Sequence, residues 1–241
     1  IYENRDRELL HDLDSIPFPY RGRLDEYKDK LIYYETSRGC PNNCTYCLSA
    51  TIKGVRFFSL ERVKADISYL ISHNVKKIKF VDRTFNCHEQ RALEIMQFII
   101  DEVIKNRAET TFHFEICADL LSAQMLLFLK QVPNGVFDFE IGVQSTMTEA
   151  LKAVNRKTDL PKLEDNIRQL KDAGNIHLHL DLIAGLPHEG YEEFAASFND
   201  VYHLQPDIIQ LGFLKLLKGS PIRVANNHYG YVFQTNPPYQ V

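Results

Sequence analysis

Strand-like segments alternate with helical segments along most of this 241-residue chain. The strand-like segments are rich in β-branched and aromatic residues, often in alternation with polar ones. They cover residues 31–36, 77–81, 111–116, 137–143, 177–183 and 208–214. An alternation of this kind builds a parallel sheet in which right-handed crossovers connect the strands. We therefore expect an α/β fold with six parallel strands.

Several helix starts are indicated by residues that can cap a first turn. Ser59 precedes a stripe of apolar residues, and Asn86 with Glu89 and Thr146 with Glu149 have capping-box spacing. Further helices are expected at 122–131, between Thr146 and Gly174 with a break near Pro161, and at 192–203. Six strand–helix units are too few to close an eight-stranded barrel. We expect a partial, TIM-like (β/α)6 barrel, with a doubly wound open sheet as the alternative.

Three of the five cysteines lie close together after the first expected strand. Cys40, Cys44 and Cys47 have the spacing CxxxCxxC, on a loop where Pro41 discourages both strand and helix. Iron–sulfur clusters normally take four cysteines. Three thiolates would bind three irons of a four-iron cluster and leave the fourth iron open to a small ligand.

A structural zinc site is the competing interpretation of these cysteines. Zinc takes four ligands, usually as two CxxC-like pairs. The remaining cysteines, Cys87 and Cys117, are single, although Cys87 together with His88 could complete a zinc site. The spacing favours the cluster, for which we expect Cys87 and Cys117 to be dispensable.

The composition is that of an ordinary globular domain, with 44% hydrophobic and 25% charged residues. The net charge of −4 argues against nucleic acid as a partner of this segment. No apolar run approaches the length of a membrane span, and no secretory signal pattern is present. Clustered cysteines indicate a reducing, cytoplasmic location rather than a disulfide framework.

Polar and reactive residues collect where the expected strands end. They are the three clustered cysteines, Asp82-Arg83-Thr84, Glu115, Gln144-Ser145, Asp181 and Gly185-Leu186-Pro187. In barrel-type parallel sheets the carboxyl ends of the strands carry the chemistry. Asp181 stands inside an apolar strand, and a buried acid needs a partner. The sequence therefore predicts one site, at this end of the sheet.

These motifs resemble the radical S-adenosylmethionine (SAM) superfamily. The cysteine spacing is similar to that of the superfamily as a whole. The stretch 142–145, then Leu151 and Arg156, and then the stretch 181–187 look like its oxygen-independent coproporphyrinogen oxidase and methylthiotransferase branches. The resemblance covers about residues 31–220 and implies a partial barrel, a [4Fe–4S] cluster on the three cysteines and SAM on the open iron. One electron, from a donor such as flavodoxin or ferredoxin, would cleave SAM to a 5′-deoxyadenosyl radical.

The resemblance also implies contacts to the ribose and the carboxylate of SAM. Glu115 would bond the ribose hydroxyls, and Gln144 would face the ribose and the methionine part. Arg156 would pair with the SAM carboxylate, which suits the planar fork of a guanidinium. The resemblance identifies no general base.

Three further contacts are implied on the same grounds. Asp181 would lie beside the amino or ribose groups, the backbone near Ile183 would contact adenine, and Tyr46 would lie at the adenine edge. Many family members have a glycine pair after the second strand. This chain has Asp82-Arg83-Thr84 there, so its contact with the SAM amino group would come from the main chain.

The ends of the chain point to neighbouring domains. We interpret residues 1–30, with a helix in part of 4–13, as a linker or arm from an upstream domain. Residues 31–220 would form the core barrel, and residues 221–241 an extension toward a further domain. The proline-punctuated stretch 16–20 resembles enzymes with an upstream cobalamin-binding domain. This resemblance implies cobalamin held outside this chain, and methyl transfer or another carbon-centred reaction.

Two other functions stay open at this point. A methylthiotransferase-like modifier of tRNA would need a second cluster or an RNA-binding domain elsewhere. A non-catalytic, zinc-bearing barrel would act as a binding module. No residue identifies the substrate.

Overall fold

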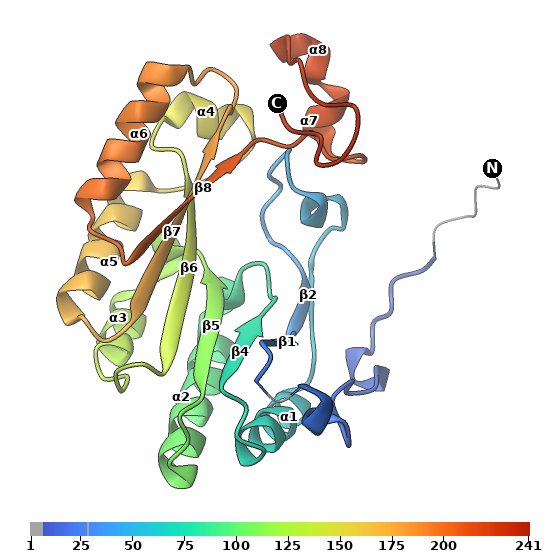
Figure 1. The fold of residues 1–241 in the computed structure, drawn as a ribbon, viewed down its shortest axis with the longest axis vertical. Coiled ribbons are helices and arrows are strands. Elements are labelled where there is room, and N and C mark those ends of the chain that lie inside the picture. The colour runs from blue at the N-terminus through green and yellow to red at the C-terminus, as the bar shows by residue number, and fades with distance from the viewer. Residues whose placement is uncertain (1–6, 28) are drawn as a thin grey trace.

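A computed structural model describes residues 7–27 and 29–241 of the chain. Its centre is a six-stranded sheet in which all neighbouring strands are parallel (Figure 1). The strands, in spatial order, are β1 (Ile32–Tyr34), β4 (Lys77–Phe80), β5 (Thr111–Ile116), β6 (Phe137–Gln144), β7 (His177–Ala184) and β8 (Ile208–Phe213). A doubly wound sheet would reverse its strand order, whereas this order follows the chain. No pairing joins β8 to β1 among the described residues, so the expected open α/β barrel is confirmed.

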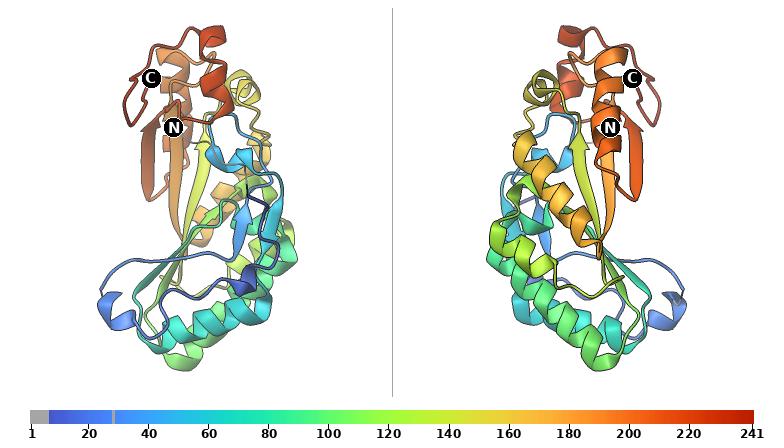
Figure 2. Two further views of the ribbon diagram at one scale, coloured as in Figure 1. Left: turned by 90° about the vertical axis from the view of Figure 1, so that its right-hand side faces the viewer. Right: turned by 90° about the vertical axis from the view of Figure 1, so that its left-hand side faces the viewer.

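Helices lie along the outer face of the curved sheet (Figure 2). They are α1 (Leu60–Ser72), α2 (Glu89–Asn106), α3 (Ala123–Leu129), α4 (Thr148–Ala153), α5 (Leu160–Ala173) and α6 (Tyr191–His203). After β8 the chain forms α7 (Pro221–Val224) and α8 (Asn226–Tyr229). A small antiparallel pair, β2 (Ser37–Gly39) and β3 (Val55–Phe57), stands apart from the main sheet. Short 3-10 turns occur at Leu13–Ser15, Leu24–Tyr27, Leu48–Thr51, Phe85–Cys87 and Ala118–Leu120.

Alternate strand residues face the helices and form the main core. Phe80, Phe112, Phe114, Phe137 and Phe139 are fully buried there, and the rings of Phe80 and Phe114 stack with centroids 4.5 Å apart. Successive side chains of a strand point to opposite faces. The residues between these phenylalanines therefore face the concave side of the sheet, and most of them are charged or polar.

The second expected helix begins later than its capping box predicts. Ser59 caps α1 as expected, accepting a hydrogen bond from the backbone N–H of Arg62 at 3.1 Å. Asn86, however, does not cap α2, whose N-cap is His88. The Asn86 side chain instead bonds both the N–H and the carbonyl of Cys117, at 3.0 and 2.8 Å. The cap prediction was wrong because this tertiary contact takes both amide groups.

The region between Thr146 and Gly174 also differs in detail from the prediction. Thr146 does not cap α4, which begins after Met147, because the Thr146 hydroxyl donates to Asp200 of α6 at 2.6 Å. The break between the two helices lies at 154–159 rather than at Pro161. Pro161 lies in the first turn of α5, where its missing N–H costs no hydrogen bond.

The segment before β1 packs on the sheet and helices. Leu13 and Leu24 are buried in the main core, and Phe18 and Tyr20 pack against it. The helix expected within 4–13 lies partly outside the described residues, and residues 7–12 are not helical. None of the described helices combines the length and apolar character that crossing a bilayer requires.

Candidate cofactor site

An open cavity lies at the carboxyl ends of the strands. Its wall includes Cys40, Cys44, Tyr46, Cys47, Thr84, Glu115, Cys117, Glu140, Gly142, Gln144, Arg156 and Asp181. Eight of the nine site residues expected from the sequence meet here. The ninth, Ile183, instead packs in a small apolar cluster with Leu186 and Leu214. Its expected backbone contact with adenine stays a prediction.

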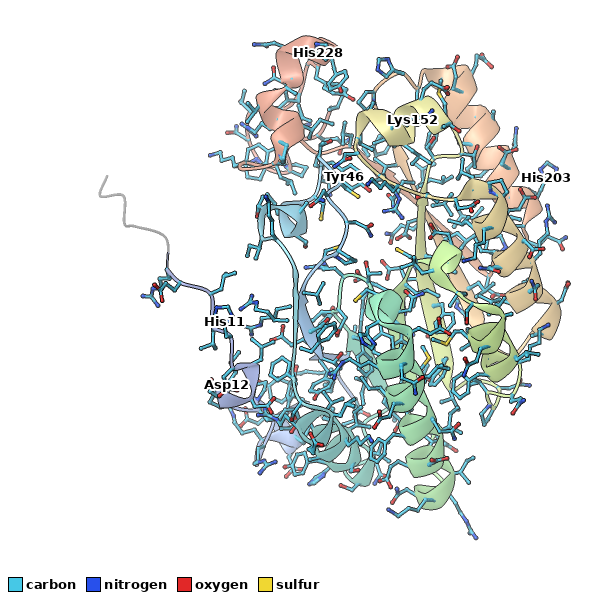
Figure 3. The ribbon with its side chains drawn as sticks, turned by 180° about the vertical axis from the view of Figure 1, so that it is seen from behind. His11, Asp12, Tyr46, Lys152, His203 and His228 are labelled. Atoms are coloured by element: carbon cyan, nitrogen blue, oxygen red, sulfur yellow. The ribbon has the colours of Figure 1, made fainter. Side chains whose placement is uncertain are left out.

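The cysteine loop is held at both of its ends. Its start follows β2, and its end is tied by a hydrogen bond from the N–H of Thr45 to the carbonyl of Val154, at 2.9 Å. The carbonyl of Thr45 accepts from the N–H of Ile222 in α7 at 3.0 Å. In Figure 3, Tyr46 lies at this end of the sheet, close to the carboxyl-terminal helices. The fold thus places the loop over the strand ends.

The three thiols do not converge on one metal ion in the described part of the chain. All three are free, and in the part of the chain that the structure describes no three cysteine, histidine or acidic side chains converge on a single-ion site. In a [4Fe–4S] cluster each thiolate binds a different iron, so the thiols need not converge. A zinc ion would need four ligands around one point. The donor set therefore fits the iron–sulfur cluster and lends zinc no support.

Arg156 reaches the cysteine loop from the end of α4. Its Nη1 lies 3.8 Å from Sγ of Cys44, and Nη2 donates to the carbonyl of Gly142. Its Nε is buried and has no hydrogen-bond partner among the described residues. Burial alone would lower the pKa of Arg156, but Tyr46 and the thiols of Cys117 and Cys44 raise it above its usual range. The guanidinium is thus a fixed cation, and its Nε–H is still free to donate a hydrogen bond. Both properties suit an anionic ligand.

Gln144 adopts an unusual backbone conformation at the end of β6. Its φ is +72°, a region that non-glycine residues rarely occupy, and the pairing of β6 with β7 shifts register between Gly142 and Gln144. A methyl group on Gly142 would overlap with Nε2 of Gln144 and lie 3.4 Å from Nη2 of Arg156. The glycine therefore makes room for the Gln144 amide beside the guanidinium.

Glu140 is the most strongly paired acid on the concave face. Its Oε2 accepts from Nζ of Lys79 at 2.6 Å and lies 2.8 Å from Nε2 of His113. The hydrogen bond with His113 and the bond and charge of Lys79 lower the pKa of Glu140 to about 2. Lys79 also lies 3.9 Å from Glu115, whose pKa is raised, mainly by burial. Glu140 is therefore a permanent anion in the cavity wall.

Asp181 is the least compensated acid in the cavity. Its Oδ1 lies 3.3 Å from Nε2 of His179, but neither buried atom has a well-formed hydrogen bond in the described structure. Burial and the nearby charge of Glu140 raise the pKa of Asp181 to about 7. Near neutral pH this carboxyl group can therefore either donate or accept a hydrogen bond, which suits the amino and hydroxyl groups of a ligand.

The cavity wall also includes Glu140 and Cys117, which the sequence analysis did not name as site members. Glu140 and Cys117 lie on the concave face by simple strand alternation, in step with Gln144 and Glu115 respectively. That alternation was the available signal. Thr84, expected among the polar residues at the strand ends, does line the cavity, and its Oγ1 lies 3.6 Å from Sγ of Cys40, a contact that no local pattern encodes.

Solved structures with a similar fold include two radical SAM enzymes. The methyltransferase TsrM from Kitasatospora setae, with cobalamin and a [4Fe–4S] cluster bound, aligns with a TM-score of 0.73 at 17% identity, over 89% of this chain and 42% of its own. Coproporphyrinogen III oxidase (HemN) from Escherichia coli aligns with a TM-score of 0.55 at 20% identity, over 78% of this chain and 44% of its own. At these identities the likeness establishes the fold.

Three relatives in sequence represent methyl and methylthio transfer. An uncharacterized methyltransferase of Pyrococcus horikoshii is 27% identical, over 92% of this chain and 49% of its own length. The cobalamin-dependent radical SAM methyltransferase TokK of Streptomyces tokunonensis is 27% identical, over 85% of this chain and 30% of its own length. A tRNA-2-methylthio-N(6)-dimethylallyladenosine synthase of Rickettsia bellii is 26% identical, over 81% of this chain and 46% of its own length. This chain spans about half of their length or less.

Residues 34–201 match the family model described as the Radical SAM superfamily. The matched range contains the cysteine loop and the strands from β4 to β7, whose ends form the cavity. It also contains Arg156 and Asp181. The resemblance seen in the sequence motifs is confirmed, and the chain belongs to the radical SAM superfamily.

Proposed function

We propose that this chain is the SAM-binding core of an enzyme that cleaves SAM reductively. The observation that carries the proposal is the cavity itself. It brings the three thiols of one loop together with Arg156 and with the polar ends of three strands. When bound, the [4Fe–4S] cluster used by this superfamily supplies an electron that breaks a carbon–sulfur bond of SAM and gives a 5′-deoxyadenosyl radical.

The protein side chains would hold and orient the cofactors. Cys40, Cys44 and Cys47 would bind three irons and leave the fourth to the amino and carboxylate groups of SAM. Arg156 would receive the carboxylate, because its charge is fixed and its Nε lacks a partner in the described structure. The walls around the cavity would exclude water and keep the radical from side reactions.

The strand ends would hold the nucleoside part of SAM. Glu115 and Gln144 line the same wall and would bond the ribose hydroxyls. Asp181, with a carboxyl group able to donate or accept, would face the amino or ribose groups. Tyr46 would pack at the adenine edge, and the backbone near Ile183 would complete the adenine contact.

The reaction that we propose for the whole protein is methyl transfer to a substrate carbon. The support is that a cobalamin-dependent radical SAM methyltransferase stands among the sequence relatives, and a radical SAM methyltransferase with cobalamin bound stands among the fold relatives. Cobalamin would be held by a domain other than residues 31–220, and the electron would come from a flavodoxin- or ferredoxin-type donor. Methylthio transfer to tRNA is the second candidate, on the strength of the Rickettsia bellii relative.

Metal analysis of anaerobically purified and reconstituted protein tests this proposal. We expect about four irons and four sulfides per chain, and SAM cleavage to 5′-deoxyadenosine on reduction. Cys40→Ala, Cys44→Ala and Cys47→Ala should each abolish that product. Cys87→Ala is the matched control, because Cys87 lies outside the cavity wall, and it should retain both cluster and cleavage. One tightly held zinc without sulfide would overturn the proposal.

A further inference from the structure

Asp82 is a buried acid just beyond β4 whose hydrogen bonds all go to one short segment. Asp82 is only 1% exposed, and among the described residues no cation lies within ion-pair distance of it, although the charge of Arg91 acts on it from further away. Oδ2 accepts from the N–H of Thr36 at 2.9 Å. Oδ1 accepts from the hydroxyls of Thr36 and Ser37, both at 2.6 Å. One carboxylate therefore fixes three donors on two consecutive residues.

Those two residues lead directly into the cysteine loop. Thr36 immediately precedes β2 and Ser37 is its first residue, and β2 ends at Gly39, immediately before Cys40. The carbonyl of Thr36 is contacted as well, by Nη2 of Arg91 in α2 at 3.4 Å. The entry to the loop is thus held from two elements of the barrel.

The segment that contains Asp82 also reaches the first cysteine directly. Thr84 is two residues further on, and its Oγ1 lies 3.6 Å from Sγ of Cys40. Asp82 therefore fixes the chain just before Cys40, while Thr84, in the same segment as Asp82, contacts the Cys40 thiol. The far end of the cysteine loop is anchored separately, through Thr45 and Val154.

Stability alone gives little reason for a charge at this place. Burial raises the pKa of Asp82 and the nearby charge of Arg91 opposes this only in part, so ionisation here is costly. An apolar side chain of similar size would pack there at lower cost. A carboxylate does, however, accept several directed hydrogen bonds at once and so specifies one arrangement of its donors. This property matters where a ligand thiol must be placed accurately.

We propose that Asp82 is a positioning residue that sets the place of Cys40 relative to Cys44 and Cys47. This inference rests on the function proposed above, because it concerns the same three-thiolate site. Some residues orient a metal ligand without binding the metal themselves. Replacing such a residue typically lowers metal affinity about 10- to 100-fold. Asp82 would act in this way through the N–H of Thr36 and the hydroxyls of Thr36 and Ser37.

The test compares Asp82→Asn with Asp66→Asn. Asp66 is also 1% exposed, and it accepts from the hydroxyl of Tyr34 and from Nε of Arg62. Neither partner belongs to the cysteine loop or to its entry. Both variants replace one buried carboxyl group by an amide, and Asp66→Asn also breaks an ion pair with Arg62, so each variant has its own loss of stability. Thermal unfolding of the two apoproteins measures each loss, against which the iron loss of each variant is compared.

The readouts are iron and sulfide per chain, the spectrum of the reduced cluster by electron paramagnetic resonance, and the rate of iron loss to a chelator. For Asp82→Asn we expect about 10-fold faster iron loss than in the parent, and a changed spectrum. Asp66→Asn should match the parent in both, even where its melting temperature falls. If Asp82→Asn does not fold, Ser37→Ala takes its place, because it removes only one of the three donors to Asp82. It should show a smaller increase in iron-loss rate and a smaller change in the spectrum.

The inference is overturned if Asp82→Asn, or Ser37→Ala in its place, keeps the parent's spectrum and iron-loss rate. It is also overturned if the two variants show the same increase in iron-loss rate for a given fall in melting temperature. Asp82 would then affect the cluster only through the stability of the fold. A parent protein that assembles no cluster would refute the proposed function itself. Measuring the parent first therefore separates the two failures.

Discussion

Nη1 of Arg156 lies 3.8 Å from Sγ of Cys44, although the two residues are 112 positions apart in the chain. A second nitrogen of the same guanidinium donates to the carbonyl of Gly142. These two contacts fix the group beside the cysteine loop and leave Nε without a partner in the described structure. A cation fixed in this way needs no reorganisation when an anion arrives, and it offsets part of the negative charge of the thiolates.

Replacement of Arg156 should therefore weaken SAM binding while the cluster remains. Hydrogen bonds to charged groups contribute about 1.5–3 kcal/mol, so Arg156→Lys should lower SAM affinity about 10- to 100-fold, because an ammonium lacks the planar fork. Equilibrium binding to the reconstituted protein measures the effect. Lys157→Ala, at the exposed neighbouring position, is the control and should leave affinity unchanged. Equal affinity in Arg156→Lys and the parent would remove Arg156 from the SAM site.

Gly142→Ala should disturb the same site from the strand side. A methyl group there would overlap with Nε2 of Gln144, so the amide must move away from its place beside Arg156. If Gln144 bonds SAM, losing that bond should cost about 3- to 10-fold in SAM affinity. Gly212→Ala on β8 is a matched control, because its methyl group would make only ordinary contact, 3.6 Å from the carbonyl of Leu182. Unchanged affinity in Gly142→Ala would count against a SAM contact by Gln144.

The sequence predicts the fold well because local patterns determine it. Strand alternation and helical periodicity locate all six strands of the main sheet, and the strand ends locate the cavity. What is missed depends on contacts between distant segments. Asn86 and Thr146 have capping sequences, but their side chains bond Cys117 and Asp200.

The charged network on the concave face likewise cannot be predicted from local sequence patterns. Glu140 meets Lys79 and His113 only because three strands pair in one particular register. The sequence places each of these residues on a face of its own strand, yet it does not say which residue of the next strand lies opposite. The pKa of each acid in the cavity depends on that register, so the differing behaviour of Glu140 and Asp181 emerges only from the structure.

Asp181 should make stability fall as the pH rises toward neutrality. The pKa of Asp181 is about 7 in the folded protein and starts from an ordinary value of 3.8, because burial and the charge of Glu140 disfavour its ionised form. Between these values the unfolded chain releases this proton while the folded chain keeps it. The folded state therefore loses relative stability through that range and loses no more above it.

Asp181→Asn has no proton to release and should escape this loss. Relative to the parent, its free energy of unfolding should rise by about 2 kcal/mol between pH 5 and pH 8, since each pKa unit corresponds to about 1.4 kcal/mol. Glu140 does not interfere, because it titrates near pH 2. Urea unfolding of the two apoproteins under anaerobic, reducing conditions measures the difference at each pH. A difference that stays constant from pH 5 to pH 8 would mean that Asp181 ionises normally, and its carboxylate would then meet SAM as an acceptor only.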